Sequence, residues 1–536
     1  MKTVKLFWLF AVMILFSANV SAKHSGGNVN RLFILGGELS NSAATSVADI
    51  DEVMPRMAAL GLNTVLVPAY WDLIEPVEGK YDWTLVDRVI DKARENRLQV
   101  VFLWFGVWKN SMSCYAPLWF KQDTRKYPRA MTQNGKPLEI ASAFSEEVFQ
   151  ADCRVFTRLM EHLAAKDKGI GTVSMIQIEN EIGMLEDARD HSPLAEKEYQ
   201  KSGQGRYPAT IEGDEQWMAE HYARYVERLA QVARRIYDVP LYVNAAMNSR
   251  GRKPGEYPSA GPLAHLAPIW KKYAPTVDIL APDIYDTGFK GWARQYALPD
   301  NPLFIPESRC CENSGVRALY AFGQFDALGF SPFAIDEAPA ADTRHVTEAY
   351  SLIRQMKNYI VNARQKAWQK GRWQQENGQW GVLFDREDRE EVISDGSAVL
   401  TCRHFFTLPW DARAKTEQWA EGGAIIHRMA ENEYLIAGSG VVVEFKTKSE
   451  KQQEEQKVLG EDGFAEKGNA GKTAANGKRW TGRRLGIGYV DQVEIADDGT
   501  LKFIRRDNGD QDHQGRHARI SVGEYKILHV KLYEYE

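Results

Sequence analysis

The chain has 536 residues, 44% of them hydrophobic, which is enough for two or three domains with sizeable cores. Its formal net charge at pH 7 is −5, from 67 basic and 72 acidic residues spread along the chain. This mild balance argues against nucleic acid or an anionic membrane surface as a partner. The five cysteines are too few and too scattered for a disulfide framework.

The first 22 residues have the pattern of a secretory signal peptide. Lys2 and Lys5 supply positive charge, residues 6–16 form a short apolar run, and residues 20–22 (Val-Ser-Ala) are small, as at a peptidase cleavage site. The apolar run is too short to span a bilayer comfortably. We therefore expect an exported bacterial protein, periplasmic or extracellular, with no membrane anchor after cleavage; an uncleaved anchor is the alternative.

Between residues 31 and 365, short apolar runs alternate with longer segments whose apolar residues recur at helical spacing. The runs predict eight strands, at 32–35, 63–68, 99–105, 172–179, 241–245, 277–281, 303–305 and 329–333. Eight strands separated by helices predict a closed parallel (β/α)8 barrel, the TIM barrel, with an open doubly wound sheet as the alternative. No Gly-x-Gly-x-x-Gly follows the first run, which argues against the nucleotide-binding form of the open sheet.

After about residue 366 the helical spacing fades, and short β-runs separated by Gly, Asn and Asp replace it. These runs lie at 380–384, 423–426, 434–437, 441–445 and 525–530. We predict a barrel domain over 23–365 followed by an antiparallel, β-sandwich-type accessory domain over 366–536. Residues 446–481, rich in Lys, Glu, Gln and Gly, predict a solvated, mobile insertion in the second domain.

Two of the predicted barrel strands end on a carboxylate. The fourth run leads into Asn180 and Glu181, and the seventh leads into Glu307. Because the two glutamates are about three βα units apart, we expect them on strands four and seven of the same barrel rim. Such a pair is the equipment of retaining glycoside hydrolysis, with Glu181 as acid/base and Glu307 as ionised nucleophile. A solvated surface charge is the alternative for either glutamate.

The neighbours of the two glutamates support the same chemistry. Asn180 carries an amide that can hydrogen-bond a sugar 2-hydroxyl, a contact that strengthens in the transition state. Tyr285, at the tip of strand six, is placed to donate a hydrogen bond to Glu307, with a half-buried packing role as the alternative. Strands four and seven face each other across a narrow barrel mouth, so we predict the short carboxyl separation that retention needs. No cofactor or metal is implied.

The segment from Ile176 to Gly183 (IQIENEIG) resembles the acid/base segment of the family 35 glycoside hydrolases, which are β-galactosidases. Residues 70–83 resemble the same family, and the family 42 β-galactosidases share this second segment. The resemblance covers residues 31–340, and residues 508–520 with the β-runs before them resemble the accessory domain of a bacterial subgroup of family 35. It implies exo-cleavage of terminal, non-reducing β-D-galactose with retention, with Glu181 and Glu307 in the two catalytic roles.

The loop after strand three departs from the family pattern. It reads Trp-Phe-Gly-Val-Trp-Lys-Asn over residues 104–110, where animal and fungal members place an Ala-Glu-Trp segment that grips galactose. The candidate substitutes for these sugar contacts are Glu38, Asn41, Lys109 and Asn110, with Trp71 and Trp104 as a candidate sugar platform. An ordinary loop role for the polar residues, and core packing for the tryptophans, are the alternatives.

Several functions remain open at this point. A related retaining β-glycosidase would use the same two glutamates on β-mannosides, β-glucosides or β-xylosides. A non-catalytic carbohydrate-binding barrel would usually lack one of the glutamates, and a structural envelope protein would need neither. The long loop at 183–210 suits a closed pocket and hence exo-action. We expect a carbohydrate partner, such as xyloglucan fragments with galactose branches from plant cell walls.

Overall fold

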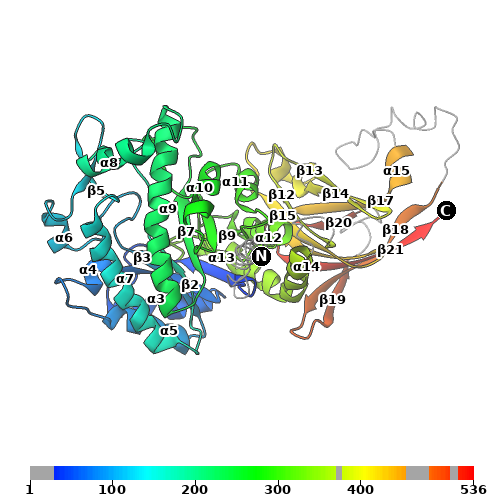
Figure 1. Cartoon of the computed structure of the whole chain (residues 1–536). Helices are drawn as coiled ribbons and strands as arrows, with labels where there is room; N and C mark the ends of the chain where they lie inside the picture. Colours follow the sequence, from blue (N-terminus) through cyan, green and yellow to red (C-terminus); the bar gives the residue numbers. More distant parts are fainter. Residues whose placement is uncertain (1–28, 370–376, 454–481, 508–516) are drawn as a thin grey trace, which may run out of the picture.

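The computed structural model describes residues 29–369, 377–453, 482–507 and 517–536 (Figure 1). The predicted signal peptide and most of the predicted insertion at 446–481 lie outside the described residues, as does most of the segment 508–520. Within the described part, no helix has both the length and the apolar character needed to cross a bilayer. All five cysteines are free thiols.

The first domain is built on a parallel sheet in the order β10-β8-β7-β6-β3-β2-β1-β11-β9. Its segments are β1 (Ile34–Glu38), β2 (Thr64–Tyr70), β3 (Gln99–Phe105), β6 (Val173–Gln177), β7 (Leu241–Ala246), β8 (Ile279–Ile284), β9 (Phe304–Ile305), β10 (Glu307–Ser308) and β11 (Gly329–Phe330). The two outermost segments, β9 and β10, are separated in the chain only by Pro306, which has no N–H for the ladder. They are halves of one strand, so the sheet closes on itself and the predicted (β/α)8 barrel is confirmed.

Strand β1 runs further than its apolar run, from which we predicted residues 32–35. The strand continues through two glycines because its neighbours approach closely: a Cβ atom at Gly36 would lie 2.2 Å from Oγ of Ser331. This extension carries Glu38 to the carboxyl end of the barrel, where active sites of this fold lie.

Strand β8 also outlasts its predicted end at residue 281. Pro282 and Asp283 look like a strand terminus in the sequence, yet both pair with neighbouring strands in register. The consequence is a carboxyl group inside the barrel rim that the sequence reading placed in a loop.

Helices alternate with the strands and cover the outside of the barrel (Figure 1). The main ones are α3 (Val47–Ala59), α5 (Thr84–Glu95), α7 (Glu146–Asp167), α9 (Ile211–Ile236), α10 (Ala267–Tyr273), α11 (Phe289–Tyr296), α12 (Ser314–Phe325), α13 (Ala340–Gln355) and α14 (Lys357–Gln369). Shorter elements are α4 (Trp71–Ile74), α6 (Leu118–Gln122), α8 (Pro193–Glu198), η1 (Tyr199–Gly203), η2 (Ala264–Leu266) and the hairpin of β4 (Arg129–Met131) and β5 (Pro137–Ala141). Ser46, Ser145 and Thr210 begin α3, α7 and α9, and each side chain accepts a hydrogen bond from the first turn.

The second domain consists of two antiparallel sheets. One has the order β12 (Gln379–Phe384), β15 (Gly422–Ala430), β16 (Glu433–Ser439), β21 (Lys526–Tyr535), β18 (Arg484–Ile495) and β19 (Leu501–Asp507). The other has the order β13 (Glu390–Asp395), β14 (Ala398–His404), β17 (Val441–Thr447) and β20 (His517–Ile520), and the short helix α15 (Lys448–Gln453) follows β17.

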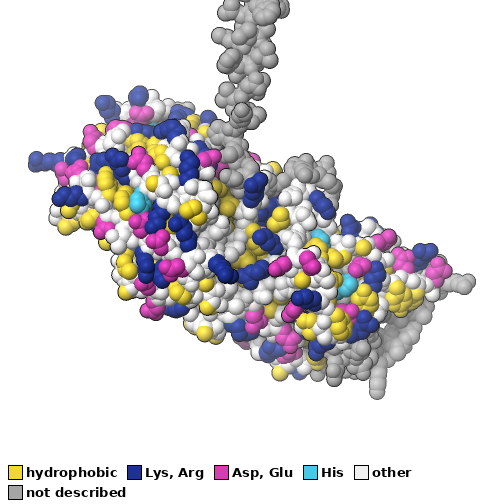
Figure 2. Space-filling view, turned by 90° about the horizontal axis from the view of Figure 1, so that it is seen from below, with side chains coloured by type: hydrophobic (Ala, Val, Ile, Leu, Met, Phe, Trp, Pro, Cys, Tyr) yellow, Lys and Arg dark blue, Asp and Glu magenta, His cyan; other side chains and the backbone are white. Residues whose placement is uncertain are grey.

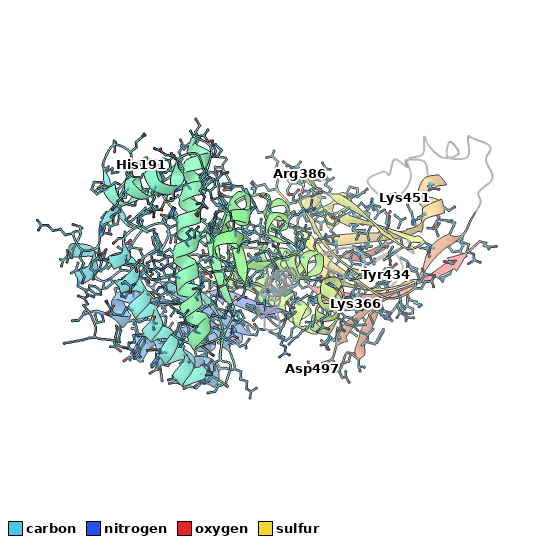
Figure 3. The ribbon with its side chains drawn as sticks, in the orientation of Figure 1. His191, Lys366, Arg386, Tyr434, Lys451 and Asp497 are labelled. Atoms are coloured by element: carbon cyan, nitrogen blue, oxygen red, sulfur yellow. The ribbon has the colours of Figure 1, made fainter. Side chains whose placement is uncertain are left out.

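Side chains of both sheets share one apolar core, which includes Ile426 of β15 and Val443 of β17. Gly440, at a φ of 71°, turns the chain from one sheet to the other between β16 and β17. Tyr434 lies within this domain (Figure 3), and its hydroxyl group donates to Asp395 at 2.9 Å. The predicted β-sandwich-type arrangement is therefore confirmed. Strands such as β19 escaped prediction because most of their residues are exposed and form no apolar run.

The two domains lie side by side, with α12 against β12 and β15 (Figure 1). A Cβ atom at Gly381 would lie 2.4 Å from the backbone nitrogen of Gln324, so glycine permits this close approach. Arg317 pairs with Glu421 at 2.7 Å across the contact. Helix α14 runs through the predicted domain boundary at residue 365. Basic and acidic side chains are intermingled on the face in Figure 2, in keeping with the mild net charge.

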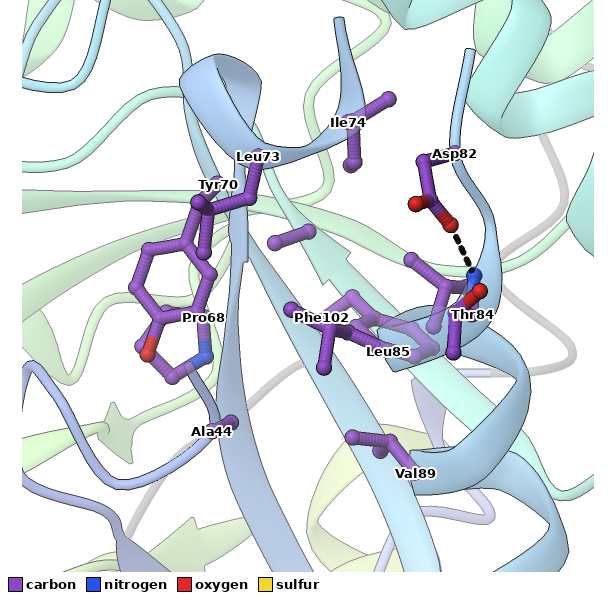
Figure 4. A pocket seen from close by; sticks show the side chains of 12 residues that line it. Ala44, Pro68, Tyr70, Leu73, Ile74, Asp82, Thr84, Leu85, Val89 and Phe102 are labelled. Atoms are coloured by element: carbon purple, nitrogen blue, oxygen red, sulfur yellow. Dashed lines mark hydrogen bonds between the residues drawn. The ribbon is translucent and has the colours of Figure 1, made fainter. Parts of the chain in front are cut away.

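A cavity of about 270 Å³ lies in the barrel wall between β2 and α5 (Figure 4). Its lining is mostly apolar and includes Leu85, Val89 and Phe102, while Asp82 accepts a hydrogen bond from the backbone of Thr84. No carboxyl group from the strand ends lines it. This cavity is therefore separate from the polar residues of the barrel rim.

Candidate active site

Five buried polar residues meet at the carboxyl end of the barrel. They come from the ends of β1, β6, β7, β8 and β10 and are Glu38, Glu181, Asn244, Asp283 and Glu307, each at most 6% exposed. Parallel strands of a barrel all end on the same rim, so residues far apart in the sequence converge there. The structure thus brings the two predicted glutamates together.

The carboxyl groups of Glu181, Asp283 and Glu307 form a tight cluster. One oxygen from each lies within 4.8 Å of one oxygen from each of the others. Such a set can hold a metal ion, but the ammonium group of Lys109 already supplies positive charge at this place. The cluster can therefore perform carboxyl chemistry with its own residues.

Glu181 has an environment that suits an acid. Burial raises its pKa to about 7, and the negative charge of Glu307 acts in the same direction, whereas Lys109 and a hydrogen bond with Asp283 lower it. A raised pKa favours the protonated form that a general acid needs. Its backbone N–H donates to Asn244 at 3.0 Å, and its φ of 46° is in the left-handed region.

Glu307 lies at the centre of a set of hydrogen-bond donors. Asn180 and Asn244 each donate an amide hydrogen to Oε1 at 3.2 Å, and the hydroxyl group of Tyr285 donates to Oε2 at 2.6 Å. The hydrogen bond expected from Tyr285 is present, and burial followed by the charge of Glu307 raises the pKa of this tyrosine well above its usual value. Three donors stabilise negative charge on Glu307 and fix its orientation.

Lys109 is the cation of the site. Its Nζ donates to Oδ1 of Asn180 at 2.9 Å, and the side chain is 4% exposed. Burial alone would lower its pKa, but the surrounding carboxyl groups raise it above the usual value. These carboxyl groups are Glu307, Glu181, Glu38 and Asp283. Lys109 thus stays charged and partly offsets their negative charge.

Glu38 faces the same cluster of carboxyl groups. Burial raises its pKa well above the usual value, and the charge of Glu307 adds to the effect. Neither oxygen has a hydrogen-bond partner within the described part of the chain. Asn41 is half-buried, with an unpartnered Oδ1. Asn110 is exposed, and its φ of 52° is in the left-handed region.

The sequence reading missed Asp283 and Asn244. Asn244 donates to Oδ2 of Asp283 at 2.8 Å as well as to Glu307, and so joins three strands. Burial raises the pKa of Asp283 well above its usual value, and the charges of Glu307 and Glu181 add to it. The available signal was a polar residue within an otherwise apolar barrel strand, which is costly unless the residue is paired or functional.

The predicted sugar platform of Trp71 and Trp104 is wrong. Both side chains are fully buried in the barrel wall, where their indole N–H groups donate to Glu75 and Asp152, each at 2.9 Å. Neither ring lines the cavity beside the carboxyl cluster. A tryptophan that does line the rim is Trp292.

A cavity of about 160 Å³ opens beside the cluster. Glu181, Asp283, Tyr285 and Trp292 line it, so it combines carboxyl groups with an aromatic face. This composition is typical of a pocket for a small polar ligand that has C–H faces.

Comparisons with known proteins bear on both domains. A family model described as "Beta-galactosidase", of glycoside hydrolase family 42, matches residues 43–234, and a model described as "Domain of unknown function (DUF5597)" matches residues 346–519. No curated protein matches the chain. Among solved structures, a polyextremophilic β-galactosidase from the Antarctic haloarchaeon Halorubrum lacusprofundi is 15% identical, with a TM-score of 0.41.

That structural match covers 61% of this chain and 58% of the haloarchaeal one, so this chain spans less than two thirds of its length. The matched family model is that of family 42, and the resemblance to family 35 stays a prediction. The matched segment includes Glu181 and its strand but ends before Glu307. Over residues 43–234 the barrel is therefore similar to the β-galactosidases of glycoside hydrolase family 42.

Proposed function

We propose that this protein is a retaining, exo-acting β-galactosidase that releases terminal, non-reducing β-D-galactose from oligosaccharides or polysaccharides. The observation that carries the proposal is the carboxyl pair of Glu181 and Glu307 on opposite strands, with oxygens within 4.8 Å of each other. The similarity of residues 43–234 to family 42 β-galactosidases supports the same sugar. We further propose that the protein is exported and acts on the galactose branches of xyloglucan fragments. We also propose that it belongs to the bacterial subgroup of family 35.

The first step forms a bond between Glu307 and the sugar. An oxygen of Glu307 attacks the anomeric carbon while the bond from that carbon to the leaving oxygen breaks. Glu181 gives its proton to the leaving oxygen, so the aglycone departs as a neutral alcohol. The products of this step are a galactosyl ester of Glu307 and an ionised Glu181.

The second step hydrolyses the ester. Esterification removes the negative charge of Glu307, which is one of the causes that raise the pKa of Glu181. The pKa of Glu181 therefore falls in the intermediate, and its carboxylate can take a proton from water. The resulting hydroxide oxygen attacks the anomeric carbon, the ester bond breaks, and β-galactose leaves with its configuration retained.

Carboxyl separation supports retention over inversion. Retaining enzymes hold the two groups about 5–5.5 Å apart, whereas inverting enzymes need about 6.5–9.5 Å to admit a water molecule. Oxygens of Glu181 and Glu307 within 4.8 Å suit the shorter spacing. Direct attack by Glu307 is consequently favoured over attack by a water molecule held between the groups.

The sugar contacts follow from the polar atoms that still lack partners. Glu38 presents two buried oxygens without donors, and Asn41 presents one, so sugar hydroxyl groups would satisfy both residues. Asn180 is placed for a hydroxyl group next to the anomeric carbon because it donates to Glu307, and Lys109 is placed beside it because Lys109 donates to Asn180. Asn110, exposed on the loop after β3, stays a candidate sugar contact.

A panel of nitrophenyl β-glycosides tests this function, with Glu307→Gln as the matched isosteric variant. We expect release from the β-galactoside, lost in the variant, and β-galactose as the first product seen by NMR. Turnover of another β-glycoside, also lost in the variant, would keep the mechanism but show that the substrate carries that sugar in place of galactose. Equal activity of the variant would contradict the role of Glu307, and no turnover of any glycoside by either protein would contradict the enzyme proposal.

A further inference from the structure

A second carboxyl pair lies behind the active-site turn and takes no part in the chemistry proposed above. Asp152, on α7, and Glu179, two residues before Glu181, are 0% and 1% exposed. The two carboxyl groups are neighbours, because Oε1 of Glu179 and Nε1 of Trp104, which donates to Asp152, both lie within 2.7 Å of the position that a Cβ atom at Gly106 would take. Two buried carboxylates in contact repel each other strongly, so at least one proton has to lie between them.

The donors around the pair decide which group carries this proton. Trp104 Nε1 donates to Oδ1 of Asp152 at 2.9 Å, and the hydroxyl group of Tyr225 donates to Oδ2 at 2.8 Å. Trp108 donates its backbone N–H to Oε2 of Glu179 at 2.7 Å, and Oε1 of Glu179 receives no hydrogen bond. Asp152 is thus surrounded as an anion, while Oε1 of Glu179 is free to carry the hydrogen.

The electrostatics of the pair agree with this assignment. Burial raises the pKa of Glu179 well above its usual value, and the charge of Asp152 adds to the rise. Burial also raises the pKa of Asp152, to about 6. The hydrogen bonds from Glu179, Trp104 and Tyr225 act in the opposite direction and lower it. The titratable groups that face the pair are Tyr225 from α9 and Cys153 from α7, and neither is a cation. No ion pair involves Asp152 or Glu179 in the described part of the chain.

The pair holds the turn that carries the predicted acid/base. Glu179 and Glu181 both have left-handed φ angles, 59° and 46°, which are unfavourable for residues with side chains. Asn180, between them, donates its backbone N–H to Trp108 at 3.1 Å. Because Trp108 also donates to Glu179, the loop after β3 and this turn are joined on both sides of Asn180.

Gly106 leaves the space that the side chains of Glu179 and Trp104 occupy. A Cβ atom at Gly106 would lie 2.2 Å from Nε1 of Trp104 and 2.7 Å from Oε1 of Glu179. Any larger residue there would push apart the groups that surround the shared hydrogen. The loop after β3 is thus shaped around this contact.

We propose that Glu179 is a neutral carboxylic acid that donates its hydrogen to the Asp152 carboxylate, and that this bond positions the turn of Asn180 and Glu181. Glu179 is then a positioning residue, not a catalytic one. Its effect on turnover rests on the proposed function, whereas its protonation state does not.

The test compares two substitutions of Glu179. In Glu179→Gln the amide oxygen can accept from Trp108 and the amide nitrogen can donate to Asp152, so this variant reproduces the neutral acid. Glu179→Leu has a similar size and is neutral, but makes neither bond. We expect Gln to keep kcat within about threefold of the wild type, and Leu to lower kcat about 100-fold with a smaller change in KM. Glu220→Leu, which removes another buried glutamate, bonded to Tyr207 and Arg224, is the matched control and should leave kcat nearly unchanged.

An infrared difference spectrum of wild type minus Glu179→Gln at pH 7 reads the protonation state without any substrate. We expect a lost carboxylic-acid C=O band, sensitive to deuterium exchange. A lost pair of carboxylate bands would overturn the proposal, as would full kcat in Glu179→Leu. If the acid band is found but no glycoside is hydrolysed by the wild type, the neutral Glu179 stands and the proposed function fails.

Discussion

The proposed role of Glu181 makes a quantitative prediction about the leaving group. The rise in the pKa of Glu181 from 4.5 to about 7 corresponds to about 3 kcal/mol in favour of the neutral acid. Glu181→Gln removes the transferable proton but keeps the size and polarity of the side chain. A positioned general acid contributes roughly 10²–10⁴-fold, so we expect kcat/KM to fall about 10³-fold for a phenyl β-galactoside. A dinitrophenyl β-galactoside, whose leaving group needs no proton, should lose far less.

The assay is the pH dependence of kcat/KM, which reports the step that forms the galactosyl ester and excludes its hydrolysis. The wild type should lose activity toward the phenyl substrate as pH rises through about 7, the pKa of Glu181. This alkaline limb should be absent in Glu181→Gln. Equal losses on the two substrates, or an unchanged limb in the variant, would refute the reasoning and assign the titration to another buried carboxyl group such as Asp283. Glu139→Gln, at an exposed position of β5, is the control.

Further predictions follow from the same contacts. A 2-fluoro galactoside with a good leaving group should leave a covalent mass increase on Glu307 in the wild type and none in Glu307→Gln; labelling of another residue would contradict the nucleophile. Lys109→Met should move the alkaline limb upward, because the charge of Lys109 lowers the pKa of Glu181; a downward shift would contradict this. Folding stability should fall as pH rises from about 4.5 to 7, because the pKa of Glu181 is higher in the folded state than in the unfolded state. In thermal unfolding, Glu181→Gln should therefore be more stable than the wild type by up to about 3 kcal/mol at pH 8. At pH 4 the variant should show no such gain. Trp104→Phe should lose about 1–3 kcal/mol of stability by leaving Asp152 short of a donor, and an unchanged melting temperature would contradict that hydrogen bond.

The barrel and the positions of Glu181 and Glu307 on its rim could be predicted from the sequence, because both depend on the pattern of residues within short segments. An apolar run buried on both faces indicates a parallel strand. In a parallel barrel, the polar residue that follows such a strand lies at the carboxyl-end rim. Strand β3 begins and ends at the predicted residues, 99 and 105, since nothing interrupts its apolar run. Strands β1 and β8 were cut short because glycine, proline or aspartate inside a strand resembles a loop.

Tertiary structure decided everything that depends on which side chains meet and how far they are from water. Trp71 and Trp104 had the composition of a sugar platform, and only the packing of the barrel wall shows that they are buried. Asp283 and Asn244 enter the site because strands distant in the sequence are neighbours on the rim.

The protonation of the carboxyl groups also depends on the tertiary structure. In the sequence, Glu179 and Glu181 are two similar residues in one short segment. In the fold, Glu179 faces Asp152 and the backbone N–H of Trp108, while Glu181 faces Glu307 and Lys109. Because desolvation and neighbouring charges set a pKa, the sequence by itself determined where the acids lie along the rim, and only the tertiary structure decided which of them hold a proton.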